Sequence, residues 1–193
     1  MATVKIPEQK VILCGEYGVG KSSIFRRFTN NTFVTATDRQ STLGLDHYDK
    51  IYKVANARDI RLQLWDTGGM ERVASVTSSY YKFAEAAILH LLDIVTYAEN
   101  AKIFLCGNKL DLVNKVPQVS DADIDAFCEQ CHNLISKTYK TSCKTSEGLE
   151  EMFSDIALQL VQSNRSKLEL QSMETHGFKL SGNEEPAEDS CLC

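Results

Sequence analysis

Residues 15–22 read Gly15-Glu16-Tyr17-Gly18-Val19-Gly20-Lys21-Ser22 and directly follow an apolar run at 11–14. After them, Ile24, Phe25 and Phe28 recur at helical spacing. The pattern G-x-x-x-x-G-K-S/T is complete and stands between a predicted strand and a predicted helix. Glycines let the backbone curl so that successive N–H groups point at a phosphate, and the start of the helix adds the positive end of its dipole. The segment therefore predicts a phosphate-binding loop.

Further groups predict how a nucleoside triphosphate and its metal would bind. Lys21 is expected to reach the β- and γ-phosphates, and the hydroxyl of Ser22 is expected to bind Mg²⁺. Asp66 opens the segment Asp66-Thr67-Gly68-Gly69 at the end of an alternating run. An acid at the carboxyl end of a strand beside the loop can hold Mg²⁺ through water. Gly69 would let a backbone N–H approach the γ-phosphate.

A third motif, Asn108-Lys109-Leu110-Asp111, sits at the end of another apolar run. A carboxylate there can accept hydrogen bonds from the N1–H and the exocyclic amine of guanine. Adenine offers no such pair of donors, so Asp111 is predicted to select guanine. Later in the chain, Thr141-Ser142-Cys143-Lys144 could present backbone amides to the oxygen of the base.

The composition indicates an ordinary globular domain. The 193 residues carry a formal net charge of −5, and 43% of them are hydrophobic. Nucleic-acid binding relies on clustered basic residues, so no nucleic-acid partner is expected. The polar N-terminus has no secretory signal, and no apolar run is long enough to span a bilayer. We therefore expect a cytoplasmic chain with reduced cysteines, in which Cys128 and Cys131 are core residues of a helix.

Strands and helices alternate along the chain, which predicts an α/β domain with a mostly parallel sheet. Strands are predicted from apolar or alternating runs, at 11–14, 43–54, 59–66, 86–94, 103–110 and 134–142. Helices are predicted from helical spacing, at 21–30, 121–131 and 146–164, with Ser146 as the N-cap of the last. Beyond 164 the sequence becomes polar and acidic, which predicts a domain over 1–164 and a disordered tail over 165–193.

Five segments, in this order, resemble a Ras-superfamily small GTPase: GEYGVGKS at 15–22, STLGLD at 41–46, WDTGGMER at 65–72, GNKLD at 107–111 and TSCKTS at 141–146. Within the superfamily, STLGLD and WDTGGMER are most similar to the Rab family. The ending Cys191-Leu192-Cys193 resembles the double-cysteine ending on which Rab proteins are geranylgeranylated. The resemblance covers roughly residues 7–164 and the last three residues.

The resemblance implies a P-loop NTPase-type three-layer fold and a GDP/GTP switch that binds Mg²⁺ and regulates vesicle traffic. It implies a lipid anchor at Cys191 and Cys193 on the cytosolic face of an intracellular membrane. The implied partners are exchange factors, GTPase-activating proteins, a prenyl-binding chaperone and effectors. The implied contacts of the guanine nucleotide are Gly15, Gly18, Val19, Gly20, Lys21, Ser22, Ser23, Phe33, Thr42, Gly69, Asn108, Lys109, Asp111, Ser142, Cys143 and Lys144. The implied metal ligands are Ser22, Thr42 and Asp66, and the catalytic positions are Lys21, Thr42 and Met70.

Three residues depart from the family pattern. Met70 stands where the family has a catalytic glutamine, and a thioether is a poor group for orienting the attacking water. Slow intrinsic GTP hydrolysis is therefore expected. Tyr17 replaces a small residue of the phosphate loop. Phe33 lies slightly farther upstream of Thr42 than the guanine-stacking aromatic of the family, so base stacking and a core or lid position both stay open.

The interval between Asp66 and Asn108 is too short for the helix, strand, second helix and loops that the family places there. Either residues 86–94 form an intact strand, or 86–89 are a strand stub and 90–100 the tail of the helix. The fourth strand and third helix are thus expected to be truncated. An alternative function follows, namely a hydrolysis-deficient or destabilised nucleotide- or effector-binding scaffold that arises from an internally deleted variant.

Overall fold

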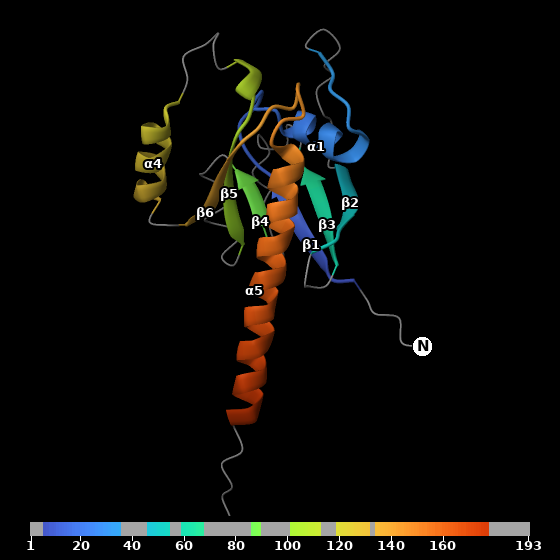
Figure 1. The fold of residues 1–193 in the computed structure, drawn as a ribbon, viewed down its shortest axis with the longest axis vertical. Coiled ribbons are helices and arrows are strands. Elements are labelled where there is room, and N and C mark those ends of the chain that lie inside the picture. The colour runs from blue at the N-terminus through green and yellow to red at the C-terminus, as the bar shows by residue number, and fades with distance from the viewer. Residues whose placement is uncertain are drawn as a thin grey trace, which may run out of the picture. The chain divides into compact units, whose positions relative to one another are not determined.

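A computed structural model describes residues 6–35, 46–54, 59–67, 86–89, 101–112, 119–131 and 134–177. These residues form one six-stranded sheet with the strand order β2-β3-β1-β4-β5-β6 (Figure 1). The strands are β1 (Glu8–Leu13), β2 (Asp46–Tyr52), β3 (Ile60–Asp66), β4 (Ala86–Leu89), β5 (Lys102–Gly107) and β6 (Ile135–Lys140). The helices are α1 (Lys21–Asn30), α4 (Asp121–Gln130), α5 (Leu149–Gly177) and a 3₁₀ helix at Leu110–Leu112.

The strand pairing confirms the predicted α/β fold with a mostly parallel sheet. Strand β2 runs antiparallel to β3 at one edge of the sheet, and every other neighbouring pair is parallel. Parallel strands place their carboxyl ends at one edge, so the loops after β1, β5 and β6 leave the sheet on the same side.

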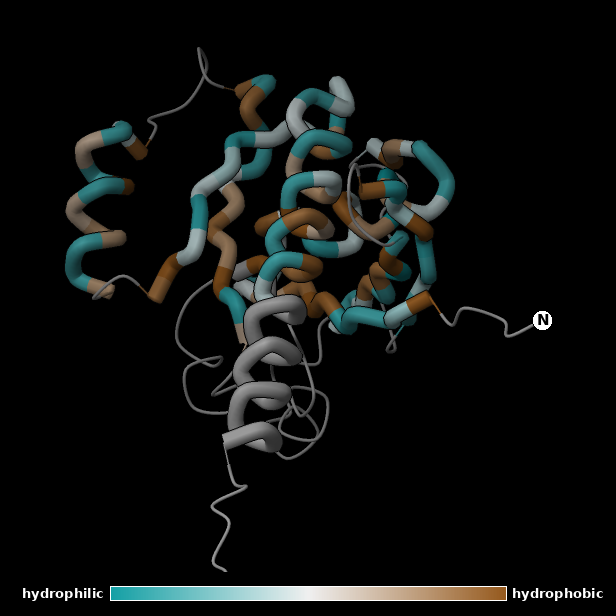
Figure 2. Tube along the Cα trace, turned by 60° about the horizontal axis from the view of Figure 1, so that its bottom comes forward, coloured by the Kyte–Doolittle hydropathy of each residue, from teal (hydrophilic) through white to brown (hydrophobic). Residues whose placement is uncertain are grey.

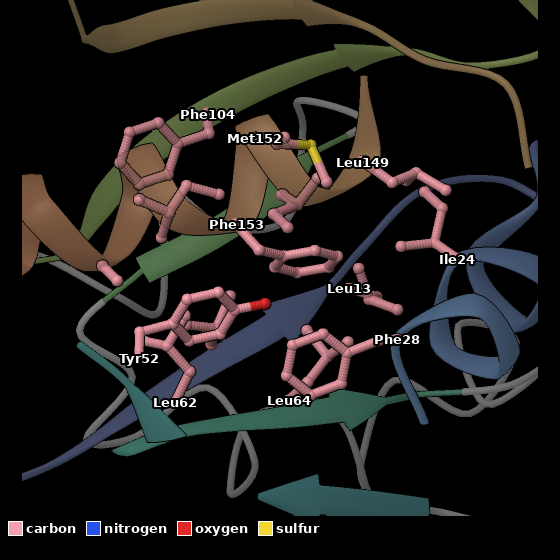
Figure 3. Packing of buried hydrophobic residues seen from close by; sticks show 14 of the residues in the cluster. Leu13, Ile24, Phe28, Tyr52, Leu62, Leu64, Phe104, Leu149, Met152 and Phe153 are labelled. Carbon is pink, nitrogen blue, oxygen red and sulfur yellow. The ribbon is translucent and has the colours of Figure 1, made fainter. Parts of the chain in front are cut away.

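One face of the sheet packs against α1 and α5. In β3, Ile60, Leu62 and Leu64 are buried while the residues between them are half-buried, which is the alternation of a strand with one core face. Val11 of β1 pairs with Leu64 and lies on the same face. The helices meet this face in a single hydrophobic cluster (Figure 3), in which the rings of Phe28 and Phe153 lie 4.6 Å apart. The packing holds α1 beside the strand ends that carry the predicted motifs.

Helix α4 is less buried than its sequence suggests. Figure 2 shows the hydrophobic stretches gathered in the central strands, whereas α4 mixes hydrophilic and hydrophobic residues. Its Phe127 and Cys128 are half-buried, and only Cys131, at its C-cap, is buried. The core prediction therefore holds for Cys131 and is wrong for Cys128. The helix begins with a capping box, in which Ser120 and Asp123 bond to each other's backbone N–H.

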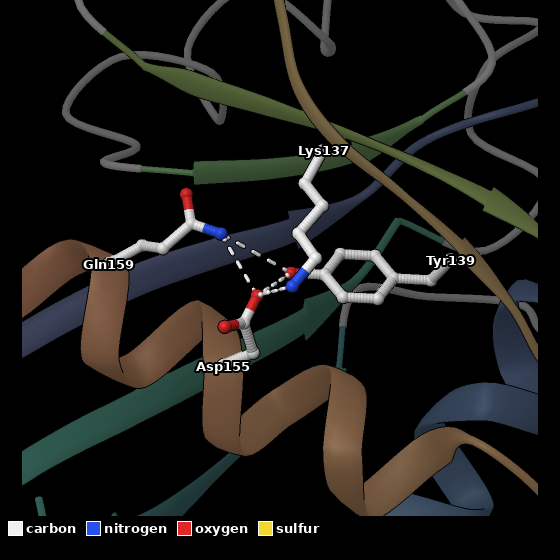
Figure 4. A network of polar contacts seen from close by, with 4 residues as sticks. All are labelled: Lys137, Tyr139, Asp155 and Gln159. Carbon is white, nitrogen blue, oxygen red and sulfur yellow. Dashed lines mark hydrogen bonds and ion pairs between the residues drawn. The ribbon is translucent and has the colours of Figure 1, made fainter.

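Asp155 of α5 links this helix to the edge strand β6 (Figure 4). Its Oδ2 accepts hydrogen bonds from Lys137 Nζ at 2.9 Å, from Gln159 Nε2 at 2.9 Å and from the Tyr139 hydroxyl. Burial disfavours the ionised carboxyl, but these donors outweigh it and hold the pKa of Asp155 below its usual range. The network fixes β6 against α5.

Strand β4 lies in the part of the chain for which the sequence leaves two alternatives. Ala86–Leu89 pairs in parallel with β1 and with β5, so it sits in the middle of the sheet. Its described length is that of the strand stub. Residues 90–100, on which the two alternatives differ, lie outside the described residues, so the truncation of the following helix stays a prediction.

Helix α5 begins later than predicted. Ser146 is not its N-cap, because Ser146 has a φ of +70° and the helix starts at Leu149. Gly148, with a φ of +71°, leads the chain into the helix, and its carbonyl accepts the helical bond from Met152 N–H. A Cβ at Gly148 would collide with the carbonyl of Lys140. Glycine is therefore the residue that this turn requires.

Helix α5 also ends later than predicted. It continues to Gly177, so the expectation of disorder from 165 onward is wrong for 165–177. Lysine, leucine, glutamate and glutamine in this stretch favour a helix even without a core-facing pattern. The chain divides into two compact units, Met1–Val161 and Gln162–Cys193.

Candidate nucleotide-binding site

The predicted motifs meet at the carboxyl edge of the sheet. The loops after β1 and β5 are joined by two side chains of the second loop. Asn108 Nδ2 donates to the carbonyl of Val19 at 3.2 Å, and Lys109 Nζ donates to the carbonyl of Gly18 at 2.7 Å. In open α/β sheets this edge is where ligands bind. The structure thus brings the phosphate loop and the Asn108–Asp111 motif together as one site.

Three glycines shape the phosphate loop. Gly15, Gly18 and Gly20 have φ values of +135°, +85° and +110°, which side-chain-bearing residues rarely adopt. A Cβ on Gly20 would also collide with the side-chain amide of Asn108. Gly20 supplies no side-chain cap to α1, and the first turn of that helix contains no acidic residue. No side chain of this turn therefore neutralises the positive end of the helix dipole, which stays available to a phosphate.

Lys21 is buried inside this loop. Its Nζ donates to the carbonyl of Gly15 and, at 3.1 Å, to the carbonyl of Glu16. A buried ammonium is costly unless it is hydrogen-bonded, so the loop carbonyls stabilise it in place. These bonds hold the charge within the curl of the loop, where a phosphate is expected.

The predicted metal ligands that the structure describes lie beside the same loop. Asp66 ends β3 and is only 1% exposed, and it pairs with Leu13 at the start of the loop. Thr67 Oγ1 donates to the Leu13 carbonyl at 2.8 Å, which ties the two strand ends together. Ser22 lies in the first turn of α1. Mg²⁺ prefers one or two protein oxygens together with phosphate and water oxygens, so a carboxylate and a hydroxyl here fit that ion.

A cavity of about 360 Å³ adjoins the phosphate loop. Its lining residues are Gly20, Ser23, Phe33, Thr35, Asn108, Lys109, Asp111, Leu112, Cys143 and Lys144. Phe33 also packs against the hydrophobic cluster of the domain. The core contact of Phe33 is therefore confirmed, and its position on the cavity wall keeps base stacking as a prediction.

Asp111 is oriented by the loop after β6. Ser142, which is fully buried, donates its hydroxyl to Asp111 Oδ1 at 2.6 Å. The Leu110 N–H donates to the carbonyl of Thr141 at 3.0 Å, so the 3₁₀ helix is bound to the same loop. A carboxylate can accept several hydrogen bonds, so Asp111 keeps acceptor capacity for a ligand in the cavity.

Cys143 is a neutral thiol in the wall of this cavity. Burial raises its pKa to about 11, and only weaker influences oppose that, the first of them the hydrogen bond to Asn108. Its Sγ donates to Asn108 Oδ1 at 3.4 Å, and its N–H donates to the same atom at 3.3 Å. At neutral pH this cysteine is a wall residue and a weak donor rather than a nucleophile.

Sequence reasoning missed Arg27. From α1, its guanidinium reaches the carbonyls of Cys143 and Lys144 in the loop after β6, across more than a hundred residues of sequence. A polar residue in the middle of an amphipathic helix usually faces solvent, so no local pattern marks this contact.

Several predicted site residues lie outside the described residues. They are Thr42, Gly69, Met70, Cys191 and Cys193. Their roles in switching, catalysis and lipid attachment stay predictions. In the helices among the described residues, we find no segment long and apolar enough to cross a membrane.

This combination of a mostly parallel sheet, a glycine-shaped phosphate loop and a carboxylate-lined cavity at one sheet edge defines a P-loop GTPase fold. The chain belongs to the Ras family, whose sequence model matches residues 10–162.

Among individual proteins the similarity is to Rab GTPases. The chain is 35% identical to the Ras-related protein Rab-30 of Homo sapiens over 172 residues, which cover 81% of each chain. It is 34% identical to the GTP-binding protein ypt5 of Schizosaccharomyces pombe over 169 residues, covering 79% of this chain and 77% of that protein. It is also 34% identical to Rab-12 of Mus musculus over 178 residues, covering 83% and 69%. The chain is thus a Rab-like small GTPase of the Ras superfamily.

Proposed function

We propose that this chain is a membrane-anchored molecular switch of vesicle traffic that cycles between GDP and GTP and hydrolyses GTP slowly by itself. One observation carries the proposal. The phosphate loop, the Asp111 carboxylate and the loop at 141–144 converge on one cavity.

Asp111 would select the base. Its carboxylate would accept hydrogen bonds from the N1–H and the exocyclic amine of guanine, while the hydroxyl of Ser142 donates to Oδ1 and orients the carboxylate. Adenine would leave that carboxylate without donors, and a site built for hydrogen bonds rejects such a ligand strongly.

Lys21, Ser22 and Asp66 would serve the phosphates. Lys21 would donate to β- and γ-phosphate oxygens from within the loop. Ser22 and Asp66 would hold Mg²⁺, which when bound neutralises charge on those oxygens. Thr42 and Gly69 would engage the γ-phosphate, and its loss would release both segments.

Slow hydrolysis is proposed from two residues. Met70 stands where the family has glutamine and cannot both accept from water and donate to phosphoryl oxygens. Tyr17 is 74% exposed on the phosphate loop, where it adds bulk in the path of an activating protein's arginine. Activators of Rab proteins can bring their own glutamine, so stimulated turnover is compatible with Met70.

The membrane role rests on the chain's ending. Lipid chains on Cys191 and Cys193 would anchor the protein to the cytosolic face of an intracellular membrane, because stable anchoring takes two chains. The proposed partners are exchange factors, GTPase-activating proteins, a prenyl-binding chaperone and effectors. A variant without residues 191–193 has no cysteine to prenylate there and should not bind vesicles under conditions in which the prenylated full chain does, and unchanged partitioning would contradict the anchor.

Titration with a fluorescent GDP analogue tests nucleotide binding, and single-turnover hydrolysis of GTP with Mg²⁺ tests turnover. Met70→Gln should raise the intrinsic rate roughly 10-fold, equivalent to about 1.4 kcal/mol of activation free energy, with GTP affinity unchanged. Met70→Leu keeps the apolar bulk and should match the wild type. An unchanged rate in the glutamine variant would move the limitation to Tyr17 or to the shortened interval.

The short central strand supports a second candidate, a nucleotide- or effector-binding scaffold that does not turn over. β4 has four residues between β1 and β5, which limits the pairing that joins the two halves of the sheet. GDP binding without measurable hydrolysis in both the wild type and Met70→Gln would favour this scaffold.

A further inference from the structure

Arg27, on α1, bonds to both sides of the cavity that adjoins the phosphate loop. Its Nε donates to the carbonyl of Cys143 at 2.7 Å, and Nη2 donates to the carbonyl of Lys144 at 3.0 Å. Its Nη1 donates to the carbonyl and to Oδ1 of Asn31, at 2.7 and 3.2 Å. Asn31 is the C-cap of α1 and stands two residues before Phe33, on the cavity wall. One guanidinium therefore holds the start of one wall and the loop that forms the other.

These bonds fix the orientation of the peptide groups in the loop. The C=O and N–H of one trans peptide point in opposite directions, and the described residues contain no cis peptide. Because Arg27 holds the carbonyl of Cys143, the N–H of Lys144 in the same peptide points away from Arg27.

The neighbouring amides of this loop have their own acceptors. Thr145 N–H donates to Ser142 Oγ at 3.2 Å, and Cys143 N–H donates at 3.3 Å to Asn108 Oδ1 on the cavity wall. The Lys144 N–H has no acceptor in the described parts of the chain, and Lys144 lines the cavity. The long bond of Cys143 and the unpaired amide of Lys144 are the two donors that a ligand could take.

We propose that Arg27 is a positioning residue for base recognition: it holds the carbonyls of Cys143 and Lys144 so that the N–H groups of this loop serve the 6-oxo group of a guanine base. The inference rests on the proposed nucleotide function and deepens it. Asp111 reads the N1 and exocyclic amine side of the base, and the loop that Arg27 holds reads the oxygen.

Arginine suits this role better than lysine. A guanidinium is planar and has five donors in fixed directions, so it reaches acceptors on both sides at once. A lysine ammonium is a compact charge and would reach part of the same set. Lysine should therefore replace Arg27 only partly.

The test separates recognition of the base oxygen from the rest of the site. Wild type, Arg27→Gln, Arg27→Lys and the control Arg26→Gln, which removes the same charge from the same helix, are titrated with GDP, IDP and ADP in competition with a fluorescent GDP analogue. IDP keeps the 6-oxo group and lacks the exocyclic amine. ADP carries an amino group in place of the oxygen. Thermal unfolding of each variant is followed in parallel.

In Arg27→Gln the affinities for GDP and IDP should both fall about 10- to 100-fold, the loss expected for charge-assisted hydrogen bonds that no longer orient the loop. ADP affinity should stay constant. The GDP/ADP ratio then falls by the same factor while the GDP/IDP ratio is unchanged. Arg27→Lys should lie between, and Arg26→Gln should match the wild type.

Equal losses for all three nucleotides would overturn the proposal, because they would mark Arg27 as a structural residue only. Full rescue by lysine would overturn the requirement for a planar guanidinium. If Arg27→Gln does not fold, the ratios of Arg27→Lys decide the matter in the same way. A wild type that binds none of the nucleotides refutes the proposed function instead, and that result is separate from any difference among the variants.

Discussion

The two ends of the candidate site are built in different ways. At the phosphate end, glycines with positive φ and the start of α1 form the site from backbone, and the buried side chain of Lys21 adds positive charge. At the base end, side chains hold loops in place, with Ser142 on Asp111 and Arg27 on the carbonyls at 143 and 144. A phosphate is symmetric and highly charged, so backbone amides suffice for it. A base must be distinguished from others, which requires donors and acceptors at fixed positions.

The largest effect is expected at the base end. Asp111→Asn exchanges an acceptor for a group that also donates, which suits the extra carbonyl of xanthine. The ratio of GDP to XDP affinity should shift by about 10⁴-fold toward XDP, because the variant side chain offers a hydrogen-bond partner to xanthine and no longer offers both acceptors to guanine. Competitive titration with both nucleotides measures it.

Asp125→Asn is the matched control, since Asp125 is an exposed carboxylate on α4. It should leave the ratio unchanged. If the ratio of GDP to XDP affinity in Asp111→Asn stays within threefold of the wild type, Asp111 does not recognise the base. The proposed difference between the two ends of the site would then be wrong.

At the phosphate end we expect a loss of nucleotide affinity that is the same for every base. Lys21→Met removes the buried ammonium and keeps an apolar side chain of similar length. GDP, IDP and XDP affinities should each fall about 100-fold, as for the loss of a charge-assisted bond to phosphate. GMP affinity should hardly change, because Lys21 is proposed to reach only the β- and γ-phosphates. Lys53→Met, at an exposed position, is the control.

This division also decides what the sequence could predict. The phosphate loop is local, because eight consecutive residues contain its glycines and its lysine, and the strand and the helix that flank it adjoin them directly. Asp66 lies at the end of β3, as the alternating run predicts, whereas β5 ends at Gly107 and Asp111 lies in the 3₁₀ helix that follows it. The role of Arg27 could not be predicted, since its acceptors in the loop after β6 lie 116 and 117 residues away. The start of α5 was missed because Gly148 is required by a close approach to the carbonyl of Lys140, eight residues earlier, rather than by any helix signal.

A smaller effect is expected on the stability of the domain, with nucleotide binding at both ends of the site unchanged. Asp155→Asn removes the carboxylate that accepts from Lys137, Tyr139 and Gln159. Lys137 is half-exposed, so solvent weakens its share and we expect a loss of about 1–2 kcal/mol at pH 7. The GDP/ADP ratio should be that of the wild type.

This loss should depend on pH. The pKa of Asp155 is lowered in the folded state, so its contribution is complete above the unfolded pKa of about 3.9 and is lost as pH falls through the folded value. Urea unfolding at several pH values should show the wild type and Asp155→Asn converging below pH ~4. Glu151→Gln, at an exposed position of α5, should run parallel to the wild type over the same pH values.

The smallest expected change lies away from the carboxyl edge. Tyr52 pairs with Ile60 at the opposite end of β3 from Asp66, and its side chain is 6% exposed. Its hydroxyl is buried and has no hydrogen-bond partner among the described residues. Burial, with a smaller contribution from Glu150, raises the pKa of Tyr52 above its usual range, as expected for a hydroxyl that water does not reach.

Tyr52→Phe should therefore stabilise the domain by about 1 kcal/mol, because it removes a polar group that is buried without a partner and keeps the ring that stacks on Phe28. The midpoint of urea unfolding should rise at unchanged slope. Tyr48 is 44% exposed, so Tyr48→Phe should leave the midpoint in place. Nucleotide affinities and their ratios should be those of the wild type in both variants, because neither end of the site contacts Tyr52. A lower midpoint in Tyr52→Phe would mean that the hydroxyl has a partner in solution, and a changed GDP affinity would tie this distant edge of the sheet to the site.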